Sequence, residues 1–314
     1  MESIVISLNA VLPLFIMTLL GFVLKKTGIV TSRAMKQMNR ICYLIFIPIL
    51  LFNNIYKTEL EDIVHPGLII FAVISVLAIW VISIIISLLT EKTPQTRGAM
   101  IQGMYRSNFT LYGLPIVTFL FGSENVGITS FLIAIVVPMF NVMAIITLET
   151  FRGGKSSIGK IAAGVVKNPL MIGSVLGILA LAVDLHLPAF IETSINSLSS
   201  LAVPLSLIIM GASFSFTKIR HKKWQLALTV AMRMLIFPAV FLSISILLGF
   251  RDIQLASLMA LFASPTAIVS YPMAVQMESD GEFACGVLMF TTIISIATVF
   301  LFVFLLQYFG YILL

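Results

Sequence analysis

Ten apolar segments, most of them long enough to cross a lipid bilayer, run through this chain of 314 residues. They lie at approximately 5–24, 36–56, 67–89, 97–121, 126–150, 161–183, 188–213, 225–249, 252–277 and 284–310. A transmembrane helix needs about 20 predominantly apolar residues. Charged residues make up only 10% of the chain, against about 25% in soluble domains. The sequence therefore predicts an all-α polytopic membrane protein with ten transmembrane helices that contact the lipid bilayer.

Two stretches of the chain repeat each other. Segments 13–21 (PLFIMTLLG) and 169–177 (PLMIGSVLG) share Pro, Leu, Ile, Leu and Gly in register, 156 positions apart. The same offset relates Pro48 to Pro204. A chain that repeats at half its length consists of two structural units. We predict a first repeat at 1–155 and a second at 156–314, with five spans in each.

Lysine and arginine are concentrated in every second connection between the predicted spans. Fifteen follow spans 1, 3, 5 and 7, whereas the opposite connections hold only Lys57 and Arg251. Cytoplasmic loops are rich in these residues, so odd-numbered spans run inward and both termini lie outside the cytoplasm. The connection after span 9 is acidic (Glu278, Asp280 and Glu282), but acidic residues carry little weight in this rule. With five spans each, the two units are inverted repeats, and the expected location is the plasma membrane.

Spans 4 and 9, which correspond in the two repeats, each combine proline with polar residues. The residues concerned are Asn108 and Pro115 in span 4, and Ser264, Pro265, Thr266 and Ser270 in span 9. Proline removes a backbone donor and kinks or opens a helix, so we expect breaks at Pro115 and Pro265. One interpretation is a structural kink whose hydroxyls bond back to their own helices. Paired interruptions in inverted repeats, however, mark the site of secondary transporters, and we favour that interpretation.

The charged residues placed deep within the spans are cationic. Arg106 in span 4 and Arg233 in span 8 either bind a solute or extend to the inner interface. No Asp, Glu or His lies near the middle of a span, which disfavours a proton relay or a carboxylate-bound sodium ion. Sodium binding by carbonyls and hydroxyls stays open. Together with the N-terminal ends of half-helices, the arginines favour an anionic solute, and Asn141 beside Pro138 is a further polar candidate.

Other kinds of chemistry find little support in the sequence. Cys42 and Cys285 fall inside predicted spans, where small buried apolar residues are expected, and no metal-ligand spacing accompanies them. The net charge of +6 comes from the basic connections and gives no reason to expect a nucleic-acid partner. The chain has no His-Glu-x-x-His and no Gly-x-Ser-x-Gly. We therefore expect no enzyme activity, no cofactor and no metal.

Several motifs resemble the auxin efflux carrier family, which includes plant carriers and bacterial malonate or malate permeases. The matching elements, in chain order, are Leu12-Pro13 with Gly21 and Gly28, Asn108-x4-Gly113-Leu-Pro115, Leu205–Ser213, and Pro265-Thr-Ala-Ile-Val269 followed by Ala274. No single element is highly specific, but their order and spacing are, and the resemblance covers essentially the whole chain.

The resemblance implies a fold of the bile-acid-symporter/sodium–proton-antiporter type. Spans 4 and 9 would cross as broken helices with Asn108, Pro115 and Pro265 at the crossing. Spans 1, 2, 6 and 7 would form a scaffold for an elevator-like motion, often in a homodimer. Two departures from the plant carriers, a central connection of only 151–160 and Ser270 in place of a second proline, favour a small bacterial carboxylate over auxin.

The leading hypothesis is a secondary transporter of a small organic anion, a mono- or dicarboxylate. The alternative is a sodium- or proton-coupled symporter or an exporter of amphipathic weak acids. The candidate substrate-binding residues are Arg106, Asn108, Gly113, Pro115, Asn141, Arg233, Ser264, Pro265, Thr266 and Ser270.

Overall fold

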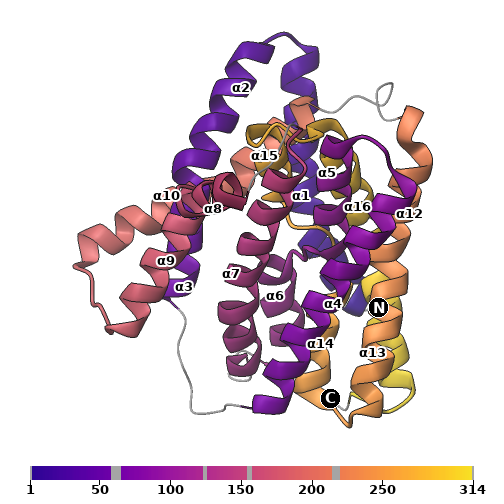
Figure 1. The fold of residues 1–314 in the computed structure, drawn as a ribbon. Helices are drawn as coiled ribbons and strands as arrows, with labels where there is room; N and C mark the ends of the chain where they lie inside the picture. The colour runs from indigo at the N-terminus through magenta and orange to yellow at the C-terminus, as the bar shows by residue number, and fades with distance from the viewer. Residues whose placement is uncertain (1, 58–64, 123–125, 154–157, 214–219, 313–314) are drawn as a thin grey trace.

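A computed structural model describes residues 2–57, 65–122, 126–153, 158–213 and 220–312, and helices dominate these segments (Figure 1). The predicted boundary between the repeats, between residues 155 and 156, lies outside the described residues. So do Lys155 and Lys218, which contributed to the predicted orientation.

The helices coincide closely with the predicted spans. They are α1 (Glu2–Lys26), α2 (Ser32–Ile41), α3 (Ile47–Tyr56), α4 (Pro66–Thr90), α5 (Pro94–Tyr105), α6 (Phe109–Phe121), α7 (Gly127–Thr150), α8 (Ile158–Val166), α9 (Pro169–Ala182), α10 (Ala189–Ser213), α12 (Lys223–Ala231), α13 (Phe237–Leu247), α14 (Asp252–Ala263), α15 (Ser270–Gln276) and α16 (Gly281–Tyr308). Each of the ten predicted segments overlaps one helix or two in series.

The membrane character of the fold is clear from its longest helical stretches. Within the described residues, six of them are long and apolar enough to cross a bilayer: Ser32–Tyr56, Pro66–Thr90, Gly127–Thr150, Ala189–Ser213, Lys223–Leu247 and Gly281–Tyr308. The prediction of a polytopic helical membrane protein is confirmed. That all ten segments cross the membrane stays a prediction.

The predicted span 6 consists of two helices, α8 and α9, which are separated at Lys167 and Asn168. The chain leaves α8 before Asn168, and a second helix begins at Pro169. Proline is well suited to the first turn of a helix because it has no N–H to leave unpaired. The Asn168 side chain caps α9 by accepting the Leu170 N–H at 3.0 Å and donates to the Tyr43 hydroxyl at 2.8 Å.

Two spans accommodate an internal proline through a π-helical turn. The turn at Cys42–Phe46 joins α2 to α3 and precedes Pro48, and the turn at Met232–Ile236 joins α12 to α13 and precedes Pro238. A proline ring clashes with the carbonyl four residues earlier, and a wider turn relieves that clash. The second of these turns contains Arg233.

Four helices pack closely in pairs through glycine, α1 along α10 and α3 along α9. A Cβ atom on Gly21 would overlap the Ile208 carbonyl, and one on Gly177 would come within 3.0 Å of the Phe52 carbonyl oxygen. Gly21 and Gly177 are 156 positions apart, as are Phe52 and Ile208. The repeated segment thus makes the same helix contact in both halves, where small residues allow backbones to approach. We call α1, α2, α3, α9 and α10 the scaffold group.

The other long helices form a bundle (α4–α7 and α12–α16) with an apolar interior. Hydrogen bonds tie its helices together: Trp80 donates to the Thr147 hydroxyl at 2.9 Å, and the Thr129 and Ser257 hydroxyls lie 2.7 Å apart. In Figure 1, α2, α3, α9 and α10 lie to the left of most of the bundle.

The acidic connection after α15 lies among basic residues of other connections. Lys222 Nζ is 2.6 Å from Asp280 Oδ2, and Arg152 Nε is 3.2 Å from Glu278 Oε2. Burial raises the pKa of Asp280, but hydrogen bonds from Lys222, the Phe283 N–H and Thr96 outweigh it and leave the pKa below its usual value. The acidic residues that disagreed with the charge rule therefore neutralise basic residues at the same end of the bundle.

Candidate functional site

Two helices of the bundle are interrupted, and the interruptions lie against each other. The chain is non-helical at Arg106–Asn108, between α5 and α6, and at Ser264–Val269, between α14 and α15. We call these two segments together the crossover. The expected break at Pro265 is confirmed.

The expected break at Pro115 is wrong. Pro115 lies inside α6 and is exposed, and the chain leaves the helix earlier, at Arg106. A single proline removes one backbone hydrogen bond, which a helix in a membrane protein tolerates. A full interruption needs partners for several backbone groups, and these exist only where the second broken segment passes.

The two segments of the crossover pair as a short antiparallel bridge between Ser107 and Thr266. The Asn108 N–H donates to the Pro265 carbonyl at 2.8 Å, and the Ala267 N–H donates to the Arg106 carbonyl at 3.0 Å. The Thr266 hydroxyl donates to the Gly103 carbonyl at 2.7 Å. Each break thus supplies hydrogen bonds to backbone groups that the other leaves without helical partners.

Arg233 stabilises the ends of both broken helices. Its guanidinium donates to the Ser264 carbonyl at 2.9 and 2.6 Å, to the Leu261 carbonyl at 3.2 Å and to the Tyr105 carbonyl at 3.4 Å. These carbonyls belong to the last turns of α5 and α14 and the residue after α14, where the helix dipole is negative. The side chain is 1% exposed, so it does not extend to the interface.

Arg106 is as deeply buried but has different partners. It is 3% exposed, and it donates to the Asn141 amide oxygen at 2.5 Å and to the Met273 sulfur at 2.6 Å. Within the described part of the chain, Arg106 forms no ion pair with a carboxylate. Burying an arginine without a counter-ion is unfavourable. An anion bound beside the Arg106 guanidinium would reduce that free-energy cost.

A cavity of about 100 Å³ opens beside the crossover. Arg106, Ser107 and Asn108 contribute to its wall, and Arg106 is the only charged residue among the described residues that line it. The Ser107 hydroxyl is buried and has no hydrogen-bond partner among the described residues. A cation and an unpaired hydroxyl at the edge of one cavity suit a carboxylate.

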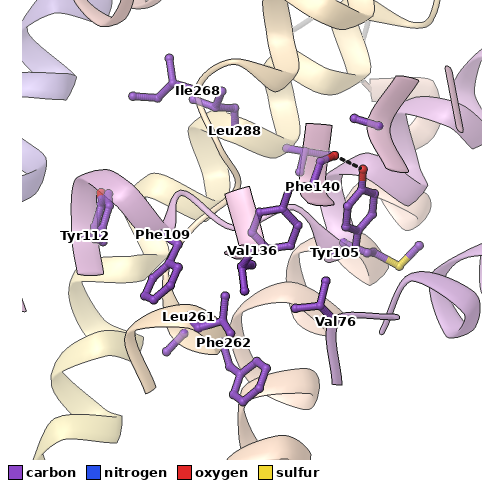
Figure 2. Packing of buried hydrophobic residues seen from close by; sticks show 14 of the residues in the cluster. Val76, Tyr105, Phe109, Tyr112, Val136, Phe140, Leu261, Phe262, Ile268 and Leu288 are labelled. Atoms are coloured by element: carbon purple, nitrogen blue, oxygen red, sulfur yellow. Dashed lines mark hydrogen bonds between the residues drawn. The ribbon is translucent and has the colours of Figure 1, made fainter. Parts of the chain in front are cut away.

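The rest of the cavity wall is mainly apolar, apart from Asn54 and Thr110, and comes partly from the scaffold group. Sequence reasoning missed Leu50, Leu51 and Asn54 of α3 and Val203 of α10. The one available signal was the polar pair Asn53-Asn54 within an apolar span. In Figure 2, Phe109 and Phe140, which also line this cavity, lie near Val136, and a dashed line joins the Tyr105 hydroxyl to the Phe140 carbonyl.

The remaining predicted residues lie around the crossover but do not line the cavity. The Ser264 hydroxyl donates to the Ala260 carbonyl of its own helix, as the structural interpretation expected. The Ser270 hydroxyl is buried without a described partner. Gly113 lies against the ring of Phe109, where a Cβ atom would come within 2.7 Å. The Asn141 amide oxygen accepts a hydrogen bond from Arg106.

A second, larger cavity of about 530 Å³ lies at the end of α1 and α2. Lys25, Lys36 and Asn39 line it together with Tyr271 of α15. Asn39 Nδ2 is 3.5 Å from the Pro272 carbonyl, so this contact between the scaffold group and the bundle is long. The two cavities therefore adjoin the same stretch of chain, from Ala267 to Val275.

Comparison with known proteins identifies the family. The model of the family described as "Membrane transport protein" matches residues 6–303. This chain belongs to that family. The resemblance to auxin efflux carriers is thereby confirmed. A family of membrane transporters is consistent with the expectation that the chain is not an enzyme.

Relatives match over nearly their whole length. An uncharacterized transporter of Methanothermobacter thermautotrophicus is 26% identical over 93% of this chain and 96% of its own. One of Methanocaldococcus jannaschii is 24% identical over 94% and 97%. A protein of Rhizobium meliloti named as a candidate malonate transporter is 20% identical over 92% of each chain.

Proposed function

We propose that this protein is a secondary transporter of a small organic anion, and that the anion binds at the crossover. The observation that carries the proposal is Arg106, a buried cation without a described carboxylate partner, in the wall of the cavity. Intramembrane arginines are costly and are retained for function. The name of the Rhizobium meliloti relative also fits a carboxylate solute.

The proposed architecture has ten spans in two inverted repeats, 1–155 and 156–314. Both termini lie on the extracytoplasmic side of the plasma membrane. The equivalent glycine contacts of Gly21 and Gly177 support the repeat. The proposed motion is elevator-like, with the bundle sliding along the scaffold group, which also forms a homodimer. Polar contacts across that boundary include Asn141–Ser174 at 3.5 Å and Asn168–Met277 at 3.9 Å. Such long contacts break at little cost.

The test is carboxylate uptake into proteoliposomes with an imposed membrane potential. Asn108→Ala should abolish uptake while leaving the yield of folded protein unchanged, because Asn108 lines the cavity and its side chain has no hydrogen bond to another described residue. Asn53→Ala, which removes a 3.1 Å bond to Ser199 within the scaffold group, is the matched control. Uptake by Asn108→Ala at the wild-type rate would remove Asn108 from the site.

A coupled symporter is the second candidate. Buried oxygen atoms of Gln102, Ser107 and Ser270 have no described hydrogen-bond partner, and neutral oxygens are ligands that sodium accepts at broken helices. Uptake that responds to a sodium or proton gradient beyond its electrical effect would support coupling. Uptake that depends on the membrane potential alone would exclude it.

A further inference from the structure

From the charges at the crossover we infer that the solute carries one carboxylate and an apolar body, and that a dicarboxylate is excluded. This inference rests on the proposed function, because it concerns the same cavity. It narrows the solute from the wider class of small organic anions. It also implies that the solute of this protein is not malonate, which the name of the Rhizobium meliloti relative suggests for that relative.

The first step is the number of cations available to a solute. Two arginines lie deep within the predicted spans, and of these only Arg106 is among the described residues of the cavity wall. Arg233 makes four hydrogen bonds to backbone carbonyls of the two broken helices. Turning it toward a solute would leave those carbonyls unpaired in the interior of the bundle. Among the described residues, one cation therefore serves the cavity, and one cation neutralises one carboxylate.

The second step is the surface that the rest of the solute would contact. Away from Arg106, Ser107 and Asn108, the wall is mainly aliphatic and aromatic, with side chains such as Leu51, Phe109, Leu111, Val137, Phe140 and Ile268. A second ionised carboxylate placed against these side chains would lose its hydration without gaining a partner. An alkyl group in the same place would gain from burial.

The third step concerns the arrangement of the carboxylate partners. Arg106, Ser107 and Asn108 are consecutive in the chain and all three contribute to the cavity wall, so they lie together at one end of it. The Ser107 hydroxyl is buried and has no hydrogen-bond partner among the described residues, so it would be free to donate to a carboxylate that reaches it. Both oxygens of a single carboxylate can be satisfied at that end, and the polar end then has no further cation to offer.

The test compares four ligands on the purified wild-type protein at pH 8: malonate, its monomethyl ester, isobutyrate and isobutyramide. The monoester keeps the skeleton of malonate and removes one charge, so it is a matched control. Ligands that bind the native state raise its melting temperature. We expect the monoester and isobutyrate to bind at least about tenfold more tightly than malonate. Isobutyramide, which lacks the charge, should cause no shift.

Three results would overturn the inference. Malonate binding as tightly as its monoester would show a second anion-binding group and would contradict a single-carboxylate solute while leaving the proposed function intact. Absence of binding by all three anions, together with absence of uptake, would remove the proposed function as well. In Arg106→Gln the difference between isobutyrate and isobutyramide should vanish. A difference that persists in this variant would also overturn the inference, because it would place the carboxylate elsewhere.

Discussion

Arg106 and Arg233 are buried to nearly the same extent but have different hydrogen-bond acceptors. Arg233 donates to carbonyls at the ends of two broken helices, whereas Arg106 is held by a neutral amide and a thioether. Carbonyls at a helix C-terminus carry partial negative charge and stabilise a cation. A thioether is a weak acceptor. Burial alone therefore does not distinguish a structural arginine from a ligand-binding one, whereas the hydrogen-bond acceptors around the guanidinium do.

The largest effect is expected when Arg233 is removed. Arg233→Met keeps the length of the side chain but leaves the carbonyls of Tyr105, Leu261 and Ser264 without their donor. A buried unsatisfied carbonyl costs about 1–3 kcal/mol, so we expect the three carbonyls together to cost roughly 3–9 kcal/mol of stability. Thermal unfolding in detergent and the yield of monodisperse protein measure it. A variant as stable as the wild type would refute the structural role of Arg233.

Arg106 should show the reverse pattern, with a large effect on transport and a small one on stability. Hydrogen bonds to charged groups contribute about 1.5–3 kcal/mol, so Arg106→Gln should lower carboxylate uptake roughly 10- to 100-fold. Its melting temperature should stay nearer the wild type than that of Arg233→Met. Arg106→Lys, which keeps the charge, should recover part of the uptake. Equal loss of uptake in the Gln and Lys variants would argue against a role of the charge.

Asn141 sharpens the comparison because it positions Arg106. Asn141→Ala removes the amide acceptor at 2.5 Å and lets the guanidinium change its orientation. We expect the half-saturating solute concentration to rise roughly three- to tenfold, with the maximal rate little changed. Saturation curves of uptake measure both quantities. A lower maximal rate at unchanged half-saturation would mean that Asn141 acts on the transport motion instead.

The ion pair of Lys222 and Asp280 lies outside the predicted spans and gives the smallest effect. Asp280→Asn should cost about 0.5–1 kcal/mol, since partly exposed ion pairs are weak. The pKa of Asp280 is lowered in the folded state, so its contribution is present above the unfolded pKa, near 3.9, and is lost as pH falls through the folded pKa. Unfolding curves between about pH 3 and pH 7 should therefore be less acid-sensitive in the variant. An unchanged acid dependence would contradict this assignment.

The helices were predictable because each needs only a local signal, a long apolar run. The break at Pro265 was also predictable from a local signal, a proline among polar residues within an apolar run. The break at Arg106 was not, because proline marks a missing donor while the position of an interruption depends on partners from another part of the chain. For Arg106 that partner segment is Pro265–Ala267, more than 150 residues later.

The residues of the candidate site likewise include some that the sequence could predict and some that it could not. Arg106 and Asn108 were predicted as site residues from their own spans, and both line the cavity. Arg233 was predicted as a solute ligand, but its acceptors lie in α5 and after α14, which sequence spacing cannot bring together. Asn54 and Val203 were missed because helix packing determines which sides of α3 and α10 face the crossover. Binding of a solute by any of these residues stays a prediction.

Equilibrium binding of a radiolabelled monocarboxylate to purified protein tests most directly whether Arg106 is the anion-binding cation. Arg106→Gln and Arg233→Lys, each checked for folding by its melting temperature, are compared with the wild type. We predict that Arg106→Gln loses at least about tenfold in affinity, while Arg233→Lys, which retains a cation near the carbonyls, binds within about threefold of the wild type. Wild-type affinity in Arg106→Gln, with loss of binding in a folded Arg233→Lys, would contradict the division of roles between the two arginines.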